Sequence, residues 1–464
     1  MPVPSASYSI TMRVHLDGDP RGIGRITTAV GEAGAVVAAV DVVESHPHQL
    51  VVDVTCNAGD SGHAAEVTKM VDAIDGVHVH KVSDRTFLLH LGGKIEVQPK
   101  VALRTRDELS RAYTPGVARV CLAIADRPDD ARRLTIKRNT VAVVSDGSAV
   151  LGLGNIGAAA AMPVMEGKAV LFKRFAGVDA WPVCLDTQDT DEIVRTVQLL
   201  APSFGGVNLE DIAAPRCFEV EERLRELLDI PVFHDDQHGT AIVVLAALTN
   251  ALRVVGKQIS AVKVTMAGAG AAGTAVLRLL LLSGTKDVVV CDDKGAVHLG
   301  RPDLDDSLRW IAENTNRDGY AGDLAGAVRG ADVFIGLSAP GILSGADIAA
   351  MAANAVVFAL ANPDPEVDPD AAMEYAAVVA TGRSDYPNQI NNVLAFPGVF
   401  RGLLDAQSRH VTEDMLIAAA QALADVVSPD EIGPHYIIPS VFHPDVASSV
   451  AVAVRDAATQ HPDR

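Results

Sequence analysis

The sequence predicts an α/β protein built from more than one domain, and three observations predict this class. First, 464 residues exceed the size at which one hydrophobic core stops growing, so about two or three domains are expected. Second, the composition is 48% hydrophobic with only 11 Phe, 6 Tyr and 2 Trp, which suits helices packed closely on sheets rather than a β-sandwich. Third, short apolar segments alternate with helical patterns along most of the chain, as they do in α/β folds.

The N-terminal part of the chain has a pattern of its own. It indicates strand, helix, strand, strand, helix and strand, in that order, at residues 8–16, 26–33, 36–44, 49–57, 64–74 and 77–89. This order is the split βαβ, or ferredoxin-like, arrangement. The module resembles an ACT domain, a small-ligand regulatory module, with residues 17–24 where such modules have their ligand loop. A dimerisation module without a ligand fits equally, because this fold hosts many roles.

Two α/β segments follow a boundary marked by Gly92, Gly93 and Pro99. In the first segment, helices alternate with short apolar strands predicted at residues 140–144, 170–172 and 183–185. The second segment opens after a helix predicted at 240–255, with strands at 261–266, 288–291, 333–336 and 356–360 and a helical tail from 401. The predicted domains are therefore residues 1–92, 93–238, 239–401 and 402–464.

A glycine-rich motif follows the strand predicted at 261–266 and leads into a helical run. It consists of Gly268, Ala269, Gly270, Ala271, Ala272 and Gly273. Between a strand and a helix, this spacing is typical of a Rossmann-type dinucleotide site, in which a helix N-terminus faces the pyrophosphate. Asp292 ends the next predicted strand, where an acid accepts hydrogen bonds from the ribose hydroxyls. A glycine turn that serves packing alone is the alternative.

The residues around Asp292 also bear on the choice of cofactor. Asp292 is followed by a second acid, Asp293, and only Lys294 is near to compensate their charge. A 2′-phosphate placed there would meet two carboxylates. The sequence therefore favours NAD over NADP.

Two further residues are candidates for proton transfer. Tyr113 lies on a Pro-Gly turn, and Lys168 lies directly before the apolar run 169–172, which we expect to be a strand. Burial favours the neutral form of a lysine, and a lysine that loses its proton readily can act as a base. Taken alone, a tyrosine more often serves packing, and Lys168 equally fits a solvated lysine at a strand edge.

Carboxylates supply the third element of a site. Glu210 and Asp211 form one acidic pair and Asp235 and Asp236 form another, each beside apolar residues that would bury it. Buried carboxylates are costly unless a cation neutralises them. Oxygen ligands without a nearby cysteine suit Mg²⁺ or Mn²⁺ better than zinc. Helix caps or solvated turns are the alternative reading of such pairs.

Seven motifs occur in one order along the chain, at residues 113–116, 144–155, 166–168, 209–211, 234–240, 361–363 and 388–393. Together they resemble the motifs of the bacterial malic enzymes, over roughly residues 100–446. The resemblance implies oxidative decarboxylation of L-malate to pyruvate and CO₂ with reduction of NAD. It also implies a homodimer or a dimer-based tetramer.

The resemblance implies a role for each candidate residue. Glu210, Asp211 and Asp236 would hold Mg²⁺ or Mn²⁺. Lys168 would take the proton of the C2 hydroxyl, with Asp235 beside it as an orienting acid, and Tyr113 would return a proton to C3 of enolpyruvate. The remaining roles are hydrogen bonds to cofactor and substrate, from Asn362 and Asn392, with Asn391 as a near alternative to Asn392.

The sequence departs from the family pattern in two places. Ala149 stands where longer malic enzymes have an arginine that clamps a substrate carboxylate, and Arg383 is a weak candidate to replace it. The N-terminal ACT-like module is not part of a minimal malic enzyme. It suggests control by a small effector whose identity the sequence does not give.

The net charge of −20, from 39 Lys and Arg against 59 Asp and Glu, excludes a nucleic-acid partner. The N-terminus lacks the basic and apolar regions of a signal peptide, and the longest uncharged stretch, 147–165, reads as loop and buried backbone rather than a membrane span. We therefore expect a cytoplasmic enzyme. Two alternatives remain: a malolactic-type enzyme that yields lactate, and a non-catalytic sensor of nucleotide and effector.

Overall fold

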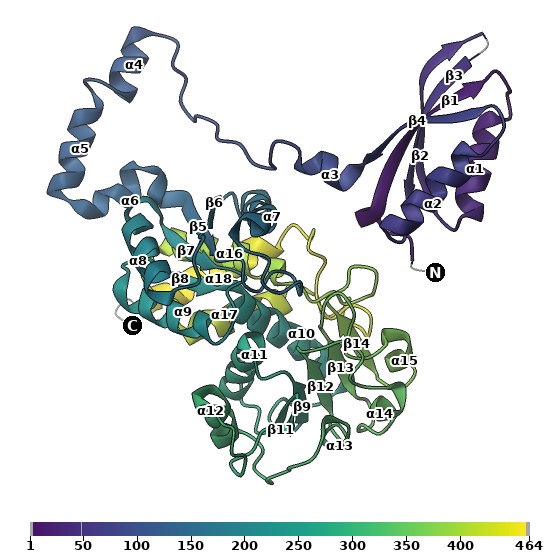
Figure 1. Ribbon diagram of the computed structural model, residues 1–464. Coiled ribbons are helices and arrows are strands. Elements are labelled where there is room, and N and C mark those ends of the chain that lie inside the picture. Colours follow the sequence, from purple (N-terminus) through teal and green to yellow (C-terminus); the bar gives the residue numbers. More distant parts are fainter. Residues whose placement is uncertain (1–2, 48, 461–464) are drawn as a thin grey trace. The chain divides into compact units, whose positions relative to one another are not determined.

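The computed structural model of the protein describes residues 3–47 and 49–460 (Figure 1). The chain forms two compact units, Met1–Val97 and Gln98–Arg464. Each unit has its own hydrophobic core, and each is described by itself.

The first unit is a four-stranded antiparallel sheet with two helices on one face. Its elements are η1 (Ala6–Tyr8), β1 (Ser9–Asp17), α1 (Gly22–Glu32), β2 (Val36–His46), β3 (Gln49–Asn57), α2 (Ser61–Asp72), β4 (Val77–Asp84) and α3 (Arg85–His90). The strand order β2-β3-β1-β4 confirms the predicted ferredoxin-like arrangement. Alternate residues of β1, such as Met12 and Val14, are buried against Ile26 of α1 and Val67 of α2.

The last predicted strand of this unit is shorter than expected. Residues 77–89 were predicted as one strand, but β4 ends at Asp84 and α3 follows it. The Asp84 side chain accepts hydrogen bonds from the backbone N–H groups of Thr86 and Phe87, at 2.8 and 3.1 Å. This N-cap starts a helix within a run that is apolar enough to read as a strand.

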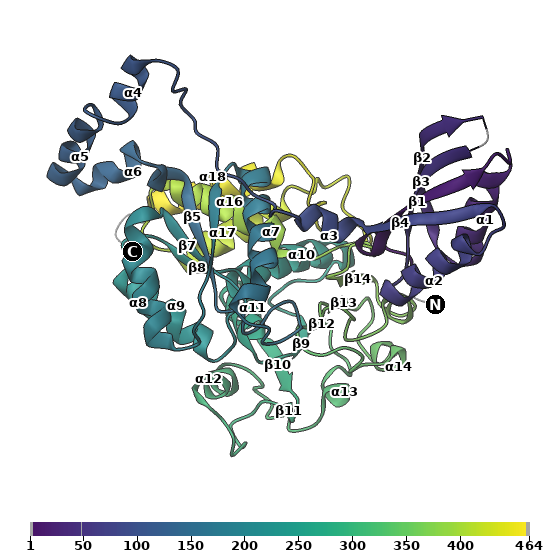
Figure 2. The same ribbon diagram turned by 45° about the horizontal axis from the view of Figure 1, so that its top comes forward.

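The second unit begins with an arm, residues 104–127, that carries α4 (Arg106–Ala112) and α5 (Val117–Asp126). Neither helix buries a side chain. Figures 1 and 2 show the arm projecting away from the sheet that follows it. Four apolar side chains of the arm are exposed: Leu109, Tyr113, Val120 and Leu122. Exposed apolar surface of this kind usually marks an interaction site.

A four-stranded parallel sheet follows the arm, after η2 (Pro128–Asp130), α6 (Ala131–Leu134) and η3 (Ile136–Asn139). Its order is β6-β5-β7-β8. The elements are β5 (Thr140–Ser145), α7 (Ala158–Ala176), β6 (Asp179–Cys184), α8 (Thr190–Leu200), η4 (Ala201–Ser203), β7 (Gly206–Leu209), α9 (Arg216–Leu227) and β8 (Val232–His234). Parallel strands bring their carboxyl ends to one edge, so the ends of β7 and β8 lie side by side.

The prediction of a strand at 170–172 is wrong, and the stretch 147–165, predicted as loop and buried backbone, is helical from residue 158 onward. Residues 158–176 form one helix, α7. Its buried residues recur at Ala161, Met165, Lys168, Ala169 and Phe172, which is the spacing of one helical face. The short run 169–172 looks like a strand only when the apolar residues before it are ignored.

Residues 263–381 of the second unit contain a six-stranded sheet of order β11-β10-β9-β12-β13-β14, which is parallel except for β11. Its strands are β9 (Lys263–Ala267), β10 (Asp287–Asp292), β11 (Gly295–Ala296), β12 (Val333–Gly336), β13 (Val356–Ala359) and β14 (Val378–Thr381). Its helices are α11 (Ala271–Leu282), α12 (Asp306–Asn314), α13 (Leu324–Ala327), α14 (Gly345–Ala349) and α15 (Pro369–Met373). This order confirms the predicted Rossmann-type sheet, in which the strand order reverses at β9.

Long helices join the two sheets of the second unit. They are α10 (Thr240–Val255), α16 (Phe396–Ala406), α17 (Glu413–Ala424) and α18 (Val446–Gln460). Residues Asp235–Val255, which include α10, are long and apolar enough to cross a bilayer. Most of α10 is nevertheless buried against α11 and α17, as expected of a core helix. At Gly398 of α16, a Cβ atom would meet Val450 of α18 at 2.7 Å, so this glycine allows the two helices to pack closely.

Candidate active site

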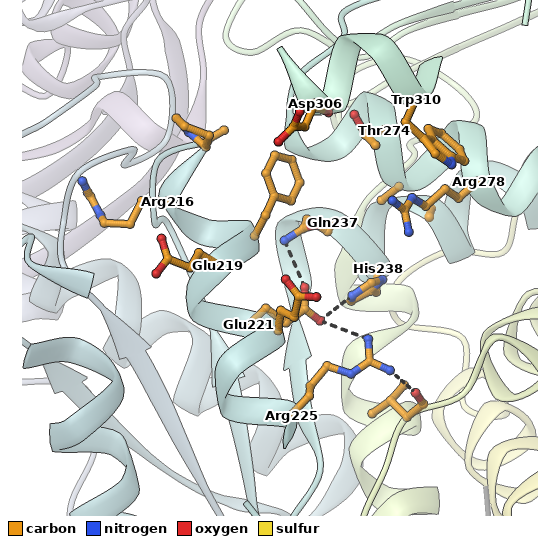
Figure 3. A pocket seen from close by; sticks show the side chains of 18 of the residues that line it. Arg216, Glu219, Glu221, Arg225, Gln237, His238, Thr274, Arg278, Asp306 and Trp310 are labelled. Carbon is orange, nitrogen blue, oxygen red and sulfur yellow. Dashed lines mark hydrogen bonds and ion pairs between the residues drawn. The ribbon is translucent and has the colours of Figure 1, made fainter. Parts of the chain in front are cut away.

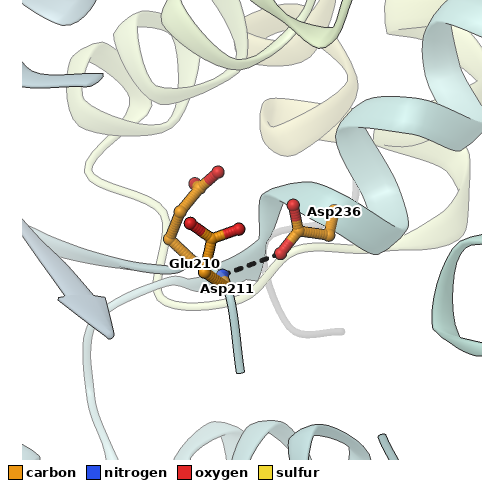
Figure 4. Close-up of side chains that lie close together, drawn as sticks. All are labelled: Glu210, Asp211 and Asp236. Carbon is orange, nitrogen blue, oxygen red and sulfur yellow. Dashed lines mark hydrogen bonds between the residues drawn. The ribbon is translucent and has the colours of Figure 1, made fainter. Parts of the chain in front are cut away.

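Three carboxylates converge at the carboxyl edge of the four-stranded sheet (Figure 4). Glu210 and Asp211 follow β7, and Asp236 lies two residues beyond β8, in the π-turn η5 (Asp235–Gly239). Each offers an oxygen within 4.8 Å of the other two. The backbone N–H of Asp211 donates to Asp236 at 2.9 Å, and Asp211 has a φ of 55°. A non-glycine residue in this left-handed region is strained, which is common at functional sites.

The three side chains fit a divalent cation. Glu210 and Asp211 are 4% and 6% exposed, and burial raises their pKa values to about 7 and about 8. Among the described residues, Asp211 Oδ2 is buried without a hydrogen-bond donor. Buried carboxylates that repel one another are stable as anions only beside positive charge, and an all-oxygen set suits Mg²⁺ or Mn²⁺.

Lys168 lies beside this cluster, on the buried face of α7. Its Nζ donates to Asp235 Oδ2 at 2.6 Å and lies 2.8 Å from Glu210 Oε1. We predicted that burial would lower the pKa of Lys168. Burial acts in that direction, but the charges of Asp235 and Glu210 outweigh it and raise the pKa above its usual value. In the metal-free site, Lys168 is therefore a protonated ammonium.

Two asparagines hold the carboxylates that contact Lys168. Asn392 Nδ2 donates to Asp235 Oδ2 at 2.6 Å, and Asn208 Nδ2 donates to Glu210 Oε2 at 2.8 Å. Asn392 thus joins the site that contains Lys168 and Asp235. The side chain of Asn391 instead accepts the backbone N–H of Val393 at 3.0 Å, as the cap of η6 (Asn392–Leu394).

The π-turn η5 has a second face, away from Lys168. Its Gln237 and His238 donate to, or share a proton with, the buried carboxylate of Glu221, at 3.2 and 2.6 Å. These residues border a cavity of about 1570 Å³ between α9, α11 and α12 (Figure 3). Glu210, Asp211, Asp235 and Asp236 do not line this cavity. It therefore lies behind the turn that carries Asp236 and is distinct from the carboxylate cluster.

The glycine-rich loop has the geometry of a phosphate site. Gly268 has a φ of 113°, and a Cβ atom there would meet Leu337 O at 2.5 Å. A Cβ atom at Gly273 would clash with Gly268 O, whereas Gly270 faces open space. The first and third glycines thus allow the tight turn and the helix packing, and the second leaves room for a ligand at the N-terminus of α11.

Asp292 lies at the end of β10, next to this loop, since the backbone N–H of Gly268 donates to Cys291 O at 2.8 Å. Arg301 donates to Asp292 at 2.8 Å, a contact that the sequence did not indicate. Asn362 follows β13, and a Cβ atom at Gly382 would lie 3.2 Å from its side-chain amide. The loops after β13 and β14 therefore meet at Asn362.

Arg383, the candidate for binding a substrate carboxylate, is paired with a carboxylate of the chain itself. Its Nε and Nη2 donate to Asp385 at 2.9 and 2.6 Å. Ala149, at the position of the missing arginine, donates its backbone N–H to Asp211 O at 3.0 Å. The 144–155 loop therefore adjoins the carboxylate cluster, but its side chain there is apolar.

Tyr113 is not part of this constellation within one chain. It lies at the end of α4, on the arm, and is 67% exposed. Both views place α4 and α5 apart from the sheet edge that carries the carboxylates (Figures 1 and 2). One chain thus assembles Lys168, Asp235, Asn392 and the three carboxylates without Tyr113.

Sequence reasoning missed Asn208, Glu221 and Arg301. Asn208 lies two residues before Glu210 in β7, and buried polar residues within an apolar strand are a usable signal of function. The contacts of Glu221 with His238, and of Arg301 with Asp292, join residues 17 and 9 positions apart. No local pattern in the sequence marks such pairs.

Comparisons with known proteins agree with this architecture. The family described as malic enzyme, N-terminal domain, matches residues 92–225, and the family described as malic enzyme, NAD binding domain, matches residues 237–459. The chain is 55% identical over 455 residues to a protein of Geobacillus stearothermophilus named NAD-dependent malic enzyme, covering 98% of this chain and 95% of that one.

A second relative and one solved structure extend the comparison. The bifunctional malic/malolactic enzyme of Bacillus subtilis is 53% identical over 83% of this chain and 93% of its own. The crystal structure of the NAD-dependent malic enzyme from Thermotoga maritima superposes with a TM-score of 0.78 at 49% identity. That alignment covers 80% of this chain and 99% of the other.

Proposed function

The chain belongs to the malic enzyme family, and from this premise we propose how its own residues catalyse the oxidative decarboxylation of L-malate to pyruvate and CO₂ with reduction of NAD. The observation that carries the proposal is the contact of Lys168 with Asp235 and Glu210, next to three carboxylates that fit a divalent cation. This contact supports the proposal because it places the candidate base next to the candidate metal ligands. The dinucleotide loop lies in the same unit.

Glu210, Asp211 and Asp236 would hold the cation, and the glycine loop with Asp292 would hold NAD. When bound, NAD accepts a hydride from C2 of malate, and the cation stabilises negative charge on the substrate as a Lewis acid. A phosphate group at the N-terminus of α11 gains from the free N–H groups there.

Lys168 would accept the proton of the C2 hydroxyl. Its pKa is raised in the metal-free site because two carboxylates contact it. Once Glu210 is engaged as a metal ligand, one of these carboxylates faces the cation, so the pKa of Lys168 falls towards the range of a base. Asp235, held by Asn392, keeps the ammonium nitrogen in place.

Tyr113 would return the proton to C3 of enolpyruvate, and a second copy of the chain would bring it there. Its arm exposes apolar side chains over two helices that bury none of their own. Such a surface is stable in water when a partner covers it. We therefore propose a homodimer, or a tetramer built from such dimers, in which Tyr113 of one copy faces Lys168 of the other.

A malolactic reaction is the second candidate, and the name of the Bacillus subtilis relative favours it. The same residues would serve, because the two reactions share the oxidation and decarboxylation of malate. They differ in the fate of the hydride. In the malolactic reaction the hydride returns from the cofactor to the product, which gives lactate.

The first unit would regulate the enzyme, as an ACT-like module that binds a small effector at the loop between β1 and α1. Asp19 in that loop accepts hydrogen bonds from the backbone and side chain of Arg21, so the loop is ordered by its own polar groups. The cytoplasm, where malate and NAD are available, is the proposed location.

One assay tests the proposed function: malate is added with NAD and Mn²⁺, and the products are measured. NADH and pyruvate in equal amounts support the NAD-dependent oxidative decarboxylation. Lactate without net NADH supports the malolactic reaction. If a folded protein that binds NADH forms neither pyruvate nor lactate, both candidates are contradicted.

A further inference from the structure

Arg301 lies between two carboxylates at the predicted ribose site. On one side, its Nη1 lies 2.8 Å from both oxygens of Asp292, at the end of β10. On the other side, its Nε and Nη2 donate to the two oxygens of Asp303, at 2.9 and 2.8 Å. Lys294 Nζ also contacts Asp303, at 2.6 Å. Asp292 and Asp303 thus share one guanidinium.

The inner part of this cluster is partly shielded from solvent, whereas the side chains of Asp303 and Lys294 at its rim are 30% and 61% exposed. The Arg301 side chain is 8% exposed and that of Asp292 is 15% exposed. The hydrogen bonds that Arg301 donates to the two carboxylates raise its pKa, and the hydrogen bonds that Asp303 accepts from Arg301 and Lys294 lower the pKa of Asp303. Each charge is therefore paired with a neighbour, and removal of one partner leaves a partly buried charge without its counter-charge.

The two contacts of Arg301 have different consequences. The contact with Asp303 uses the Nε and Nη2 edge of the guanidinium and does not involve Asp292. If Asp292 is removed, Asp303 still holds Arg301 in place, with Nη1 free and directed at the position that the Asp292 carboxylate has left. Planar guanidinium groups fixed in this way bind phosphate well.

We propose that Arg301 is a latent 2′-phosphate ligand, and that the preference of this enzyme for NAD depends on Asp292 occupying it. Asp292 then has two effects: it repels a 2′-phosphate, and it occupies the guanidinium of Arg301, a partly buried cation next to β10 that would otherwise bind the phosphate. This inference rests on the proposed function, since it assumes that a dinucleotide lies against β10.

The neighbouring acid Asp293 provides a matched control. It is exposed, and no hydrogen bond or ion pair involves its side chain among the contacts of the described residues. Asp293→Ser and Asp292→Ser each remove one negative charge from the same turn. Only Asp292→Ser frees Nη1 of Arg301.

The test is the affinity of the purified protein for NADH and NADPH, measured by nucleotide fluorescence without malate or metal. We expect Asp292→Ser to bind NADPH at least about 30-fold more tightly than the parent protein and NADH about 10-fold more weakly. In the double variant D292S/R301Q, the gain for NADPH should disappear. D292S/R301K keeps a cation but not the planar guanidinium, so it should retain only part of the gain in NADPH affinity. This variant takes the place of D292S/R301Q if the latter does not fold.

Three results would overturn the inference. They are a gain in Asp293→Ser equal to that in Asp292→Ser, a gain that persists in D292S/R301Q, and no gain in Asp292→Ser. The first would mean that the preference for NAD depends only on the negative charge of this turn and not on Arg301. Because the measurement uses nucleotide binding alone, a failure of the parent protein to oxidise malate would contradict the proposed function and leave this result unaffected.

Discussion

At the scale of single residues, the site depends on charges that are buried together. Lys168 faces Asp235 and Glu210, and Glu210 lies beside Asp211 and Asp236. The sequence identified every one of these residues, because each belongs to a short motif. It misjudged the pKa of Lys168, because the sign of that shift depends on how close the carboxylates come.

Lys168→Ala should lower kcat for malate oxidation by about 10²- to 10⁴-fold, the usual contribution of a general base, and leave Mn²⁺ binding in place. The expected loss follows from the contact of Nζ with Asp235. Turnover with NAD and calorimetry with Mn²⁺ measure the two effects. Lys173→Ala, on the same helix but with a 61% exposed side chain, is the control and should change neither. Near-normal turnover of Lys168→Ala would remove it from the mechanism.

The metal-free protein should become less stable as pH rises from about 5 to about 8. Burial raises the pKa of Glu210 to about 7 and of Asp211 to about 8, so the folded chain holds protons that the unfolded chain has released. The free energy of unfolding therefore falls across this window, and Mn²⁺ should restore it because the cation binds the ionised carboxylates.

Thermal unfolding at several pH values, with and without Mn²⁺, measures this dependence. Asp211→Asn removes one titrating group and should flatten the curve of the metal-free protein. Asp129→Asn, at a side chain that is 81% exposed, is the matched control and should leave the curve unchanged. A metal-free protein whose stability rises over this window would contradict the assignment of buried carboxylates.

At the scale of elements, strand and helix ends bring the site together. β7 and β8 end in carboxylates, α7 presents Lys168 from the side, and α11 begins at the glycine loop. Periodicity identified α10 and α11 because their apolar residues continue through the whole of each helix, which is 16 residues in α10 and 12 in α11. It failed at α7, because a short apolar stretch fits either a strand or a helix. The buried residues on either side of the stretch, which share one helical face with it, distinguish the two.

The glycine loop allows packing and binding to be separated by two substitutions. Gly273→Ala places a Cβ atom against Gly268 O and should destabilise the fold by about 1–3 kcal/mol. Gly270→Ala points its Cβ atom into open space, so it should preserve the melting temperature and weaken NADH binding. Calorimetry and fluorescence titration give the two readouts. Equal loss of stability in both variants would mean that the loop serves packing alone.

At the scale of the whole molecule, one chain does not complete the proposed site. Tyr113 lies on an arm whose helices bury none of their side chains, while Lys168 is buried in the body of the same unit. In the proposed dimer, a second copy of the chain would bring Tyr113 to Lys168. A single sequence cannot reveal this, because each motif looks complete by itself.

Complementation between two inactive variants tests the shared site. Tyr113→Phe and Lys168→Ala should each be nearly inactive alone. When the two are co-expressed and mix at random, half of the dimers contain both, and each of these has one intact site of two, so about a quarter of the parent activity should return. The activity of the purified, co-expressed protein, with a different tag on each variant to count the mixed dimers, measures this recovery. A site formed within one chain would give no recovery, and Tyr113→Phe mixed with Asp235→Asn is a second pair with the same expectation.

The sequence by itself determined the fold class, the family and the identity of the candidate ligands, because strand-helix periodicity, the glycine spacing and short motifs are local properties. The tertiary structure decided which of these residues lie together. It placed Lys168 between Asp235 and Glu210, joined Asp292 to Arg301, and held Tyr113 apart on the arm. The physical reason is that pKa values and pairings of buried charges depend on distances across the fold, and these distances are set by packing between elements remote in the chain.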